Sequence, residues 1–356
     1  MNLRRLALAW QSRPGPLIRH LERKRYPRRH ALPEVGGVRV AAIQCRLTPI
    51  PTATLFADVM YALVHSAAAT GAELLVFPEE IASTLLGLFP EIGRDGGTLE
   101  DLVAELGPRT QAADVYRLLG PWALRVYLET FSSLARHFRV QICAGSIIAP
   151  DREGRLHDVA YLFGDDGSVL GAQAKFHLTA EERRWGVTAG RALNVIPTPL
   201  ARVGLLVSTD ALRFEPARIL TLQGAEVLLV PQSTPAPYSV WRDVEGLWAR
   251  AQECAVYGVT SAAVGPMLSL ELEGRSAVYA PLDLTLSGDG RLAEAGSVDT
   301  EEIVVADLDL FALRELRRRE PPRFNVDLYQ RELGDLYGGL RGVLPLVSRT
   351  EPVTPP

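Results

Sequence analysis

The hydrophobic positions of this chain follow two periods. Short apolar runs rich in Val, Leu and Ile have the composition of buried strands, and longer segments between them place apolar residues on one helical face. The pattern predicts strands at 38–45, 73–77 and 138–149, and helices at 53–70 and 241–256. Such alternation is typical of a layered α/β domain.

Antiparallel pairing is also predicted. Two apolar runs, 159–163 and 169–174, are separated by Asp-Asp-Gly-Ser at 165–168, a composition that favours a tight turn. No Gly-x-Gly-x-x-Gly motif follows a predicted strand. We therefore expect a mixed sheet and not the purely parallel sheet of a nucleotide-binding domain.

The chain divides into three parts. Residues 1–36 form a basic N-terminal extension, and residues 37–310 contain the alternating strands and helices. Residues 311–356 form a C-terminal extension that ends in a Pro-rich tail, and we expect this tail to be disordered.

A segment at about 88–127 has the character of an insertion in this domain. It is rich in helix formers and Gly, and it predicts short helices at 101–106 and 114–119. Long insertions in compact domains often serve as lids or binding loops. A surface excursion or an oligomer contact is the other interpretation.

Composition narrows the class of protein. With 356 residues and 47% hydrophobic content, the chain can bury one large core. A formal charge of -4 does not suit a nucleic-acid-binding protein, so no nucleic acid is expected as a partner.

Three scattered cysteines, without the spacing of a disulfide framework or a zinc site, suit a reducing compartment. Because no apolar run is long enough to cross a bilayer, and no signal peptide is evident, we expect a cytoplasmic protein.

The first 30 residues are locally basic, with Glu22 as their single acid. A basic arm with apolar positions can bind an anionic surface or nucleic acid. The simpler interpretation, which we favour, is an extension that packs on its own domain or on a partner subunit. A transit peptide is a third interpretation.

Three short motifs carry candidate chemistry. One apolar strand ends in Phe-Pro-Glu79, the hairpin ends in Lys175-Phe-His-Leu, and a Gly-led apolar strand ends in a turn at Ser208. In this order the motifs resemble the nitrilase superfamily of carbon-nitrogen hydrolases, over roughly residues 38–308. In that family the third position is a cysteine. Here it is a serine.

The resemblance implies a fold and a set of roles. The fold is an α-β-β-α sandwich of two mixed sheets flanked by helices, in subunits that form homodimers or higher oligomers. Glu79 is then the general base, Lys175 stabilises the oxyanion, and residue 208 is the nucleophile that attacks a small amide or nitrile. Glu182 corresponds to a second glutamate that orients Lys175, with Glu181 as the alternative. Neither a cofactor nor a metal is expected, since no acidic or His cluster has metal-ligand spacing.

Ser208 leaves the activity open. A thiol yields nucleophilic thiolate near neutral pH, whereas a serine hydroxyl depends on a positioned base. Three accounts remain: an engineered Cys→Ser change, a natural relative without activity that binds or assembles, and a hydrolase that uses serine. Further departures from the family pattern favour a naturally divergent member, and they fall at Thr209, Glu215-Pro216, His157-Asp158 and Cys254.

Overall fold

The computed structural model describes residues 8–10, 12–26, 37–93, 97–320 and 325–340. Within these residues, the strands form a 13-stranded sheet whose main path runs β5-β4-β3-β2-β1-β9-β8-β7-β6. The sheet folds over at β1 and β9, so that its two halves lie face to face.

The first half combines parallel and antiparallel pairing. It comprises β1 (Val38–Arg46), β2 (Leu74–Val76), β3 (Gln141–Pro150), β4 (Leu156–Phe163), β5 (Val169–Ala174) and β13 (Glu302–Leu308). The strands β1, β2 and β3 are parallel, whereas β4 and β5 form the hairpin that the sequence predicts. At the other side β13 pairs antiparallel with β1, from Val38 opposite Leu308 to Gln44 opposite Glu302.

The second half has a parallel centre. It comprises β6 (Ile196–Pro197), β7 (Arg202–Leu205), β8 (Val227–Gln232), β9 (Tyr257–Met267), β10 (Leu270–Leu272), β11 (Ala277–Tyr279) and β12 (Arg291–Glu294). The strands β7, β8 and β9 are parallel. The halves are joined where β9 pairs with the end of β1, at Cys45 opposite Ala263 and Arg46 opposite Val264.

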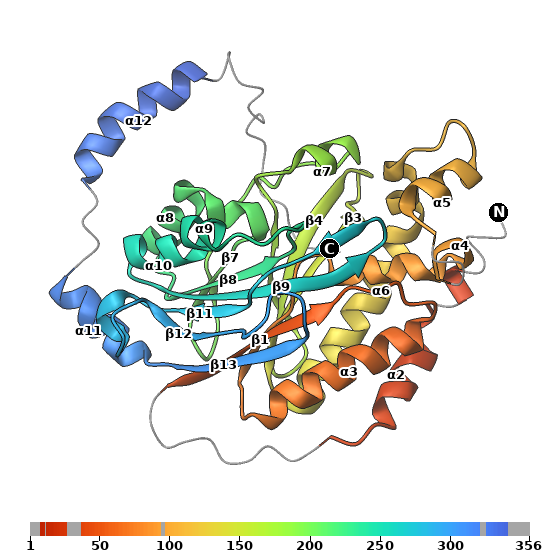
Figure 1. Cartoon of the computed structure of the whole chain (residues 1–356), viewed down its shortest axis with the longest axis horizontal. Coiled ribbons are helices and arrows are strands. Elements are labelled where there is room, and N and C mark those ends of the chain that lie inside the picture. The colour runs from red at the N-terminus through yellow and green to blue at the C-terminus, as the bar shows by residue number, and fades with distance from the viewer. Residues whose placement is uncertain (1–7, 11, 27–36, 94–96, 321–324, 341–356) are drawn as a thin grey trace.

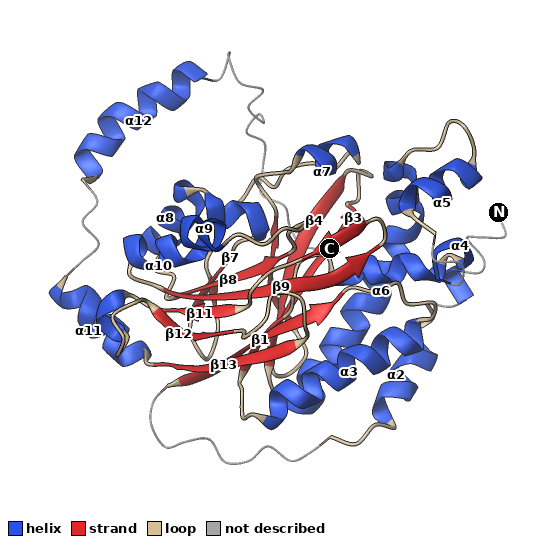
Figure 2. Cartoon of the chain, viewed as in Figure 1, coloured by secondary structure: helices blue, strands red, loops and turns tan. Residues whose placement is uncertain are grey.

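Helices cover both outer faces of the folded sheet (Figures 1 and 2). On the first half lie α2 (Pro14–Glu22), α3 (Ala53–Ala69) and α6 (Ala112–Phe138), and on the second half α8 (Phe214–Leu222) and α10 (Ala249–Cys254). The shorter helices are α4 (Pro90–Gly93), α5 (Leu99–Leu106), α7 (Ala180–Arg184) and α9 (Val240–Asp243). The C-terminal part adds α11 (Leu310–Arg319) and α12 (Val326–Leu340).

Three apolar clusters correspond to the interfaces between these layers. One joins the outer face of the first half to α3 and α6, and another joins the second half to α8 and α10. The central cluster lies between the two halves, where Val76 of β2 and Leu229 of β8 are fully buried. The predicted α-β-β-α sandwich of two mixed sheets is therefore confirmed, with the addition that the sheets are continuous at β1 and β9.

Two predicted helices differ from the structure. The short helix expected at 114–119 belongs to α6, a 27-residue helix that continues to Phe138 and so replaces the start of the strand expected at 138–149. The helix expected at 241–256 is interrupted at Gly246, whose φ of -82° and ψ of -129° are not helical. Gly lacks the Cβ that confines other residues, and its backbone adopts such angles at low cost.

Part of the basic extension packs on the domain. Leu17 and Leu21 of α2 are buried against α3 and α6, and Asp58 on α3 pairs with Lys24 at 2.5 Å and with His20 at 2.6 Å. This packing agrees with the simpler interpretation of the arm for residues 12–26. Much of the rest of the extension, and the predicted disordered tail at 348–356, lie outside the described residues.

None of the described helices combines the length and the apolar composition that a membrane crossing requires.

Candidate active site

Glu79 lies in the loop that follows β2, with only 2% of its surface exposed. The loop crosses the β3 strand closely at Gly145, where a Cβ would lie 2.0 Å from the Pro78 carbonyl oxygen, and where φ is +70°. Only glycine satisfies both conditions, so Gly145 lets the loop descend into the space between the two halves of the sheet. The next residue, Glu80, is left-handed with φ 55°.

Lys175 follows the last residue of β5 and is 2% exposed. Its Nζ donates hydrogen bonds of 2.6 Å to Glu79 Oε1 and of 2.6 Å to Glu182 Oε1. Burial lowers the pKa of a lysine, but the surrounding carboxylates outweigh burial, and the pKa of Lys175 is raised above its ordinary value. The ammonium is therefore a fixed buried cation.

Glu182 is held by the first turn of α7. The Thr179 backbone N–H donates to Glu182 Oε2 at 2.6 Å, and the Glu182 N–H donates to Thr179 Oγ1 at 3.1 Å. This reciprocal capping box fixes the carboxylate toward Lys175. Of the two candidates in the sequence, Glu182 is the one in contact with the lysine. Glu181 lines a surface pocket instead.

Ser208 is less buried than Glu79, Lys175 and Glu182. It is half-buried, it begins a short 3-10 helix (Ser208–Leu212) after β7, and its φ of 47° is left-handed. A non-glycine residue in this region stores strain, which proteins concentrate at functional positions. Burial raises the pKa of the Glu79 carboxyl, against the lowering effects of Lys175 and of a hydrogen bond from Ser208. The Ser208 side chain, from the second half of the sheet, thus acts on the carboxyl of Glu79 from the first half.

The second oxygen of Glu79 is bound by the opposite sheet half. The Ser233 backbone N–H, just after β8, donates to Glu79 Oε2 at 2.9 Å. Because β2, β7 and β8 all end in this space, Glu79, Ser208 and Ser233 meet there although they are distant in sequence.

Asp210 ties the Ser208 turn to the loop after Lys175. Its buried carboxylate accepts hydrogen bonds from the Phe176 N–H at 3.1 Å and from the His177 N–H at 2.7 Å. The His177 ring is bound to the same carboxylate, with Nδ1 2.8 Å away. His177 therefore has a positioning contact, and Asp210 joins the turn at Ser208 to the loop after Lys175.

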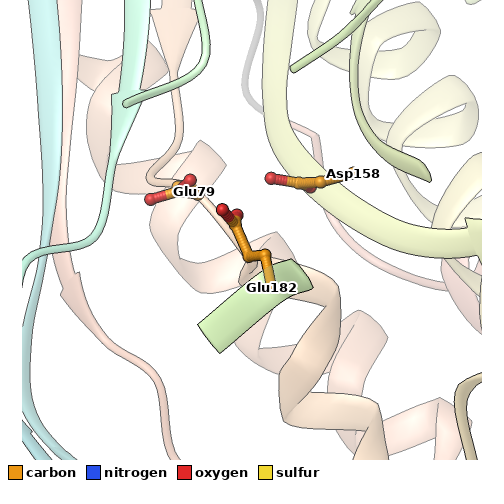
Figure 3. A group of neighbouring side chains, drawn as sticks. All are labelled: Glu79, Asp158 and Glu182. Atoms are coloured by element: carbon orange, nitrogen blue, oxygen red, sulfur yellow. The ribbon is translucent and has the colours of Figure 1, made fainter. Parts of the chain in front are cut away.

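Two acidic residues at the site were missed by sequence reasoning. Asp158 on β4 is 1% exposed, and one oxygen each of Glu79, Asp158 and Glu182 lie within 4.8 Å of one another. Figure 3 shows the three carboxyl groups directed toward a common centre. Glu80 is the second, since burial and then the charge of Glu79 raise its pKa well above the ordinary value. The available signal was an Asp directly before the apolar run predicted as a strand at 159–163.

Three converging carboxyl groups invite the question of a metal ion. The Lys175 ammonium already contacts two of them at 2.6 Å, and so supplies a positive charge at the position that an ion would need. We therefore assign the charge compensation of this centre to Lys175.

A pocket of about 430 Å³ lies between α5 and α7. Its walls include Leu99 and Val103 of α5, and Glu181 and Trp185 beside Glu182. The wall on the α5 side belongs to the segment predicted as an insertion. Glu79, Lys175 and Ser208 are not among its lining residues, and the role of the segment as a lid stays a prediction.

The three cysteines are not part of the site. Cys45, Cys143 and Cys254 are free and buried, one in each apolar cluster. Burial raises the pKa of each thiol, that of Cys143 to about 12. They are packing residues without thiolate character.

Comparisons with known proteins identify the family of this chain. The profile of the family described as Carbon-nitrogen hydrolase matches residues 39–318. A protein named Probable hydrolase YhcX, from Bacillus subtilis, is 28% identical over 286 residues, which are 79% of this chain and 52% of that protein. The chain thus spans about half the length of this relative. Omega-amidase NIT2 from Homo sapiens is 29% identical over 222 residues, 59% of this chain and 74% of its own.

A solved structure shares the fold. The crystal structure of an amidase from Nesterenkonia sp. superposes with a TM-score of 0.61 at 21% identity, over 85% of this chain and 98% of that one. The family match covers most of the chain and includes Glu79, Lys175 and Ser208. The chain therefore belongs to the carbon-nitrogen hydrolase family, within the nitrilase superfamily that its motifs resemble.

Proposed function

We propose that this protein hydrolyses the carbon–nitrogen bond of a small amide, with Ser208 as nucleophile and Glu79 as general base. One observation supports the proposal: Lys175 bridges Glu79 and Glu182 at 2.6 Å each, and the Ser208 hydroxyl acts on the same Glu79 carboxyl from the opposite half of the sheet. A base, a cation and a nucleophile thus share one site, and Ser208 is its least buried member.

The chemistry follows from the contacts. The Ser208 hydroxyl gives its proton to Glu79 as its oxygen attacks the amide carbon, and the Lys175 ammonium offsets the negative charge on the former carbonyl oxygen. The tetrahedral species expels the amine, which takes the proton from Glu79. Water then attacks the resulting ester, again with Glu79 as base, and releases the acid with Ser208 regenerated.

Glu79 has the environment that a general base for serine needs. Its pKa is raised by burial, which increases its proton affinity at neutral pH. Glu182 shares the Lys175 ammonium, so the cation stays in place while Glu79 takes up and loses a proton. Because a serine hydroxyl is a weaker nucleophile than a thiolate, turnover by this protein is expected to be slower than that of a cysteine enzyme of the same geometry.

A second candidate function is binding without turnover. Ser208 itself favours this alternative. When serine replaces cysteine in a site built for thiolate chemistry, the cation and the carboxylates remain, but the reactive sulfur is lost. Under this alternative the site binds an amide-type ligand and releases it unchanged.

Hydrolysis assays separate the two candidates. Purified wild-type protein, Ser208→Ala and Ser208→Cys are incubated with a panel of small aliphatic amides, and released ammonia is measured. The proposal predicts turnover by the wild type, loss of at least about a hundredfold in Ser208→Ala, and a gain in Ser208→Cys. Turnover only in Ser208→Cys would support the binding alternative. Equal turnover in the wild type and Ser208→Ala would exclude Ser208 as the nucleophile, and it would also exclude binding without turnover.

A further inference from the structure

The buried centre holds more carboxyl groups than its lysine can neutralise. Glu79, Asp158 and Glu182 converge within 4.8 Å, and Lys175 is the one cation among the described residues that contacts them. If all three were ionised, the centre would carry a net charge of two negative units in a place where each residue is 3% exposed or less. Burying unpaired charge is costly enough that one group takes up a proton instead.

Hydrogen bonding distinguishes the three groups. Glu79 accepts from Lys175 and from the Ser233 N–H, and Glu182 accepts from Lys175 and from the Thr179 N–H. These four hydrogen bonds, two of them from Lys175, give each oxygen of both glutamates a partner. By contrast, neither oxygen of Asp158 accepts a hydrogen bond of normal geometry within the described residues. Asp158 is therefore the group for which the neutral form is favoured most.

The surroundings of Asp158 are mostly acidic. The groups with charge or titratable protons that act on it are Tyr116 and Tyr127 of α6, Glu79 and Glu80 after β2, Lys175 after β5, and Glu182 of α7. Ser146 on β3 adds a hydroxyl whose effect favours the ionised form. One ammonium and one hydroxyl thus oppose several carboxyl groups and complete burial.

The backbone holds Asp158 close to the lysine. The Lys175 N–H donates to the Asp158 carbonyl oxygen at 2.9 Å, in continuation of the pairing between β4 and β5. An ionised Asp158 side chain would be a third anion within reach of a single ammonium that already has two partners.

We propose that Asp158 is a positioning residue that carries a proton at neutral pH, so that Lys175 remains bound to Glu79 and Glu182. When Asp158 loses its proton, it competes for the ammonium and loosens the contact between Lys175 and Glu79. The effect on turnover rests on the proposed hydrolase function, whereas the protonation of Asp158 does not depend on it. Burial and the charge of Glu79 raise the pKa of this carboxyl to about 8, against Lys175 and Ser146.

The direct test is a pH titration of aspartate carboxyl carbons, labelled with ¹³C in the whole protein and followed by NMR. Comparison with Asp158→Asn assigns the Asp158 resonance. We expect that resonance to titrate near pH 8 in the wild type. Asp166→Asn is the matched control, because Asp166 lies in the turn of the same hairpin, is fully exposed, and has a lowered pKa owing to its bonds with Ser168. Titration of the Asp158 resonance below pH 5 would overturn the proposal.

A second variant keeps the test decisive if Asp158→Asn does not fold. Ser146→Ala removes the hydroxyl that favours ionisation, so the alkaline aspartate transition of the wild type is expected to move to higher pH. An alkaline transition that is absent from the wild type, or that Ser146→Ala leaves unmoved, would contradict the assignment.

Turnover supplies the functional readout. The ratio of wild-type to Asp158→Asn activity is expected to fall about tenfold between pH 7 and pH 9, as one ionisation near 8 requires, and Asp166→Asn is expected to track the wild type. If the activity ratio stays constant between pH 7 and pH 9 while the NMR resonance shows an alkaline transition, the positioning role of Asp158 is overturned, but its protonation at neutral pH is upheld. If no variant hydrolyses an amide, the proposed function fails, and the NMR result still decides the protonation of Asp158.

Discussion

Lys175 Nζ lies 2.6 Å from Glu79 Oε1 in a place where both side chains are almost completely shielded from water. A second bond of 2.6 Å joins the same ammonium to Glu182. A salt bridge of this kind contributes little net stability compared with an apolar packing, but removing one partner leaves the other as an uncompensated charge. The geometry is therefore sensitive to substitution at the lysine.

Lys175→Met is expected to destabilise the protein by about 3–5 kcal/mol at pH 7, because the buried glutamates lose their only neighbouring cation among the described residues. Urea unfolding followed by circular dichroism measures the change. Lys24→Met is the matched control: Lys24 pairs with Asp58 at the partly exposed surface, and its loss is expected to cost about 1 kcal/mol or less. Similar losses for the two variants would contradict the buried bridge.

Asp210→Ala is expected to cost about 2–4 kcal/mol, since the Phe176 and His177 N–H groups lose their acceptor. The turn at Ser208 also loses its tie to the loop after Lys175, so any amide turnover should fall through kcat as well. Thermal unfolding and steady-state kinetics measure the two effects. Asp289→Ala, at an exposed turn with two local bonds, is the control and should change both quantities much less.

Thiol alkylation reports on the accessibility of position 208. In the folded wild type, iodoacetamide is expected to modify no cysteine rapidly, because Cys45, Cys143 and Cys254 are buried and their thiol pKa values are raised. The Ser208→Cys variant should gain one fast-reacting thiol. Intact-mass spectrometry counts the adducts, and a wild type that reacts as fast as the variant would contradict this account of the cysteines.

Acid is expected to release α2 from the domain. Although burial acts in the opposite sense, bonds from Lys24 and His20 lower the pKa of Asp58. A carboxyl group with a lowered folded-state pKa contributes stability above its unfolded value of about 3.9, and this contribution is lost as pH falls through the folded value. Hydrogen exchange of residues 14–22, corrected for intrinsic rates, should therefore rise below about pH 4.

The matched variants make the origin of this release clear. Asp58→Asn should loosen α2 already at pH 7, whereas Asp307→Asn, which breaks a similar pair with Arg39 on the sheet, should leave α2 protected. Equal protection of α2 in both variants would contradict the role of Asp58.

If deletion of residues 1–30 does not change co-sedimentation with anionic vesicles, the surface-binding interpretation of the arm is wrong.

The sequence indicated the parts of the site that lie in local motifs. Glu79 and Lys175 were indicated by the ordered motifs that resemble the nitrilase superfamily, and Glu182 was left beside Glu181 as an alternative until the capping box with Thr179 placed it against Lys175. Asp158 was noted only as a departure from the family pattern and not as a site residue, because it joins the centre only when β4 pairs with β5 and brings it beside Lys175. Ser233 was missed for the same reason: it follows β8 in the second half of the sheet, and its backbone N–H donates to Glu79, which belongs to the first half.

Helix boundaries show a second limit of local patterns. The segment 112–138 contains Pro121, and its apolar spacing suggested separate short elements, yet it forms one helix that packs along β3. Tertiary packing of the buried residues Val126, Phe131 and Leu134 outweighs the helix-breaking tendency of a single proline.

The most direct test of Ser208 as the nucleophile is the capture of its acyl ester. Wild-type protein is mixed with an activated acyl donor, quenched in acid within seconds, and analysed by intact mass and by peptide mapping, with Ser208→Ala and Glu79→Gln in parallel. The account predicts one acyl group on Ser208 in the wild type, none in Ser208→Ala, and slow acylation in Glu79→Gln, which lacks the base. An unmodified Ser208 in a protein that nevertheless hydrolyses amides would contradict it.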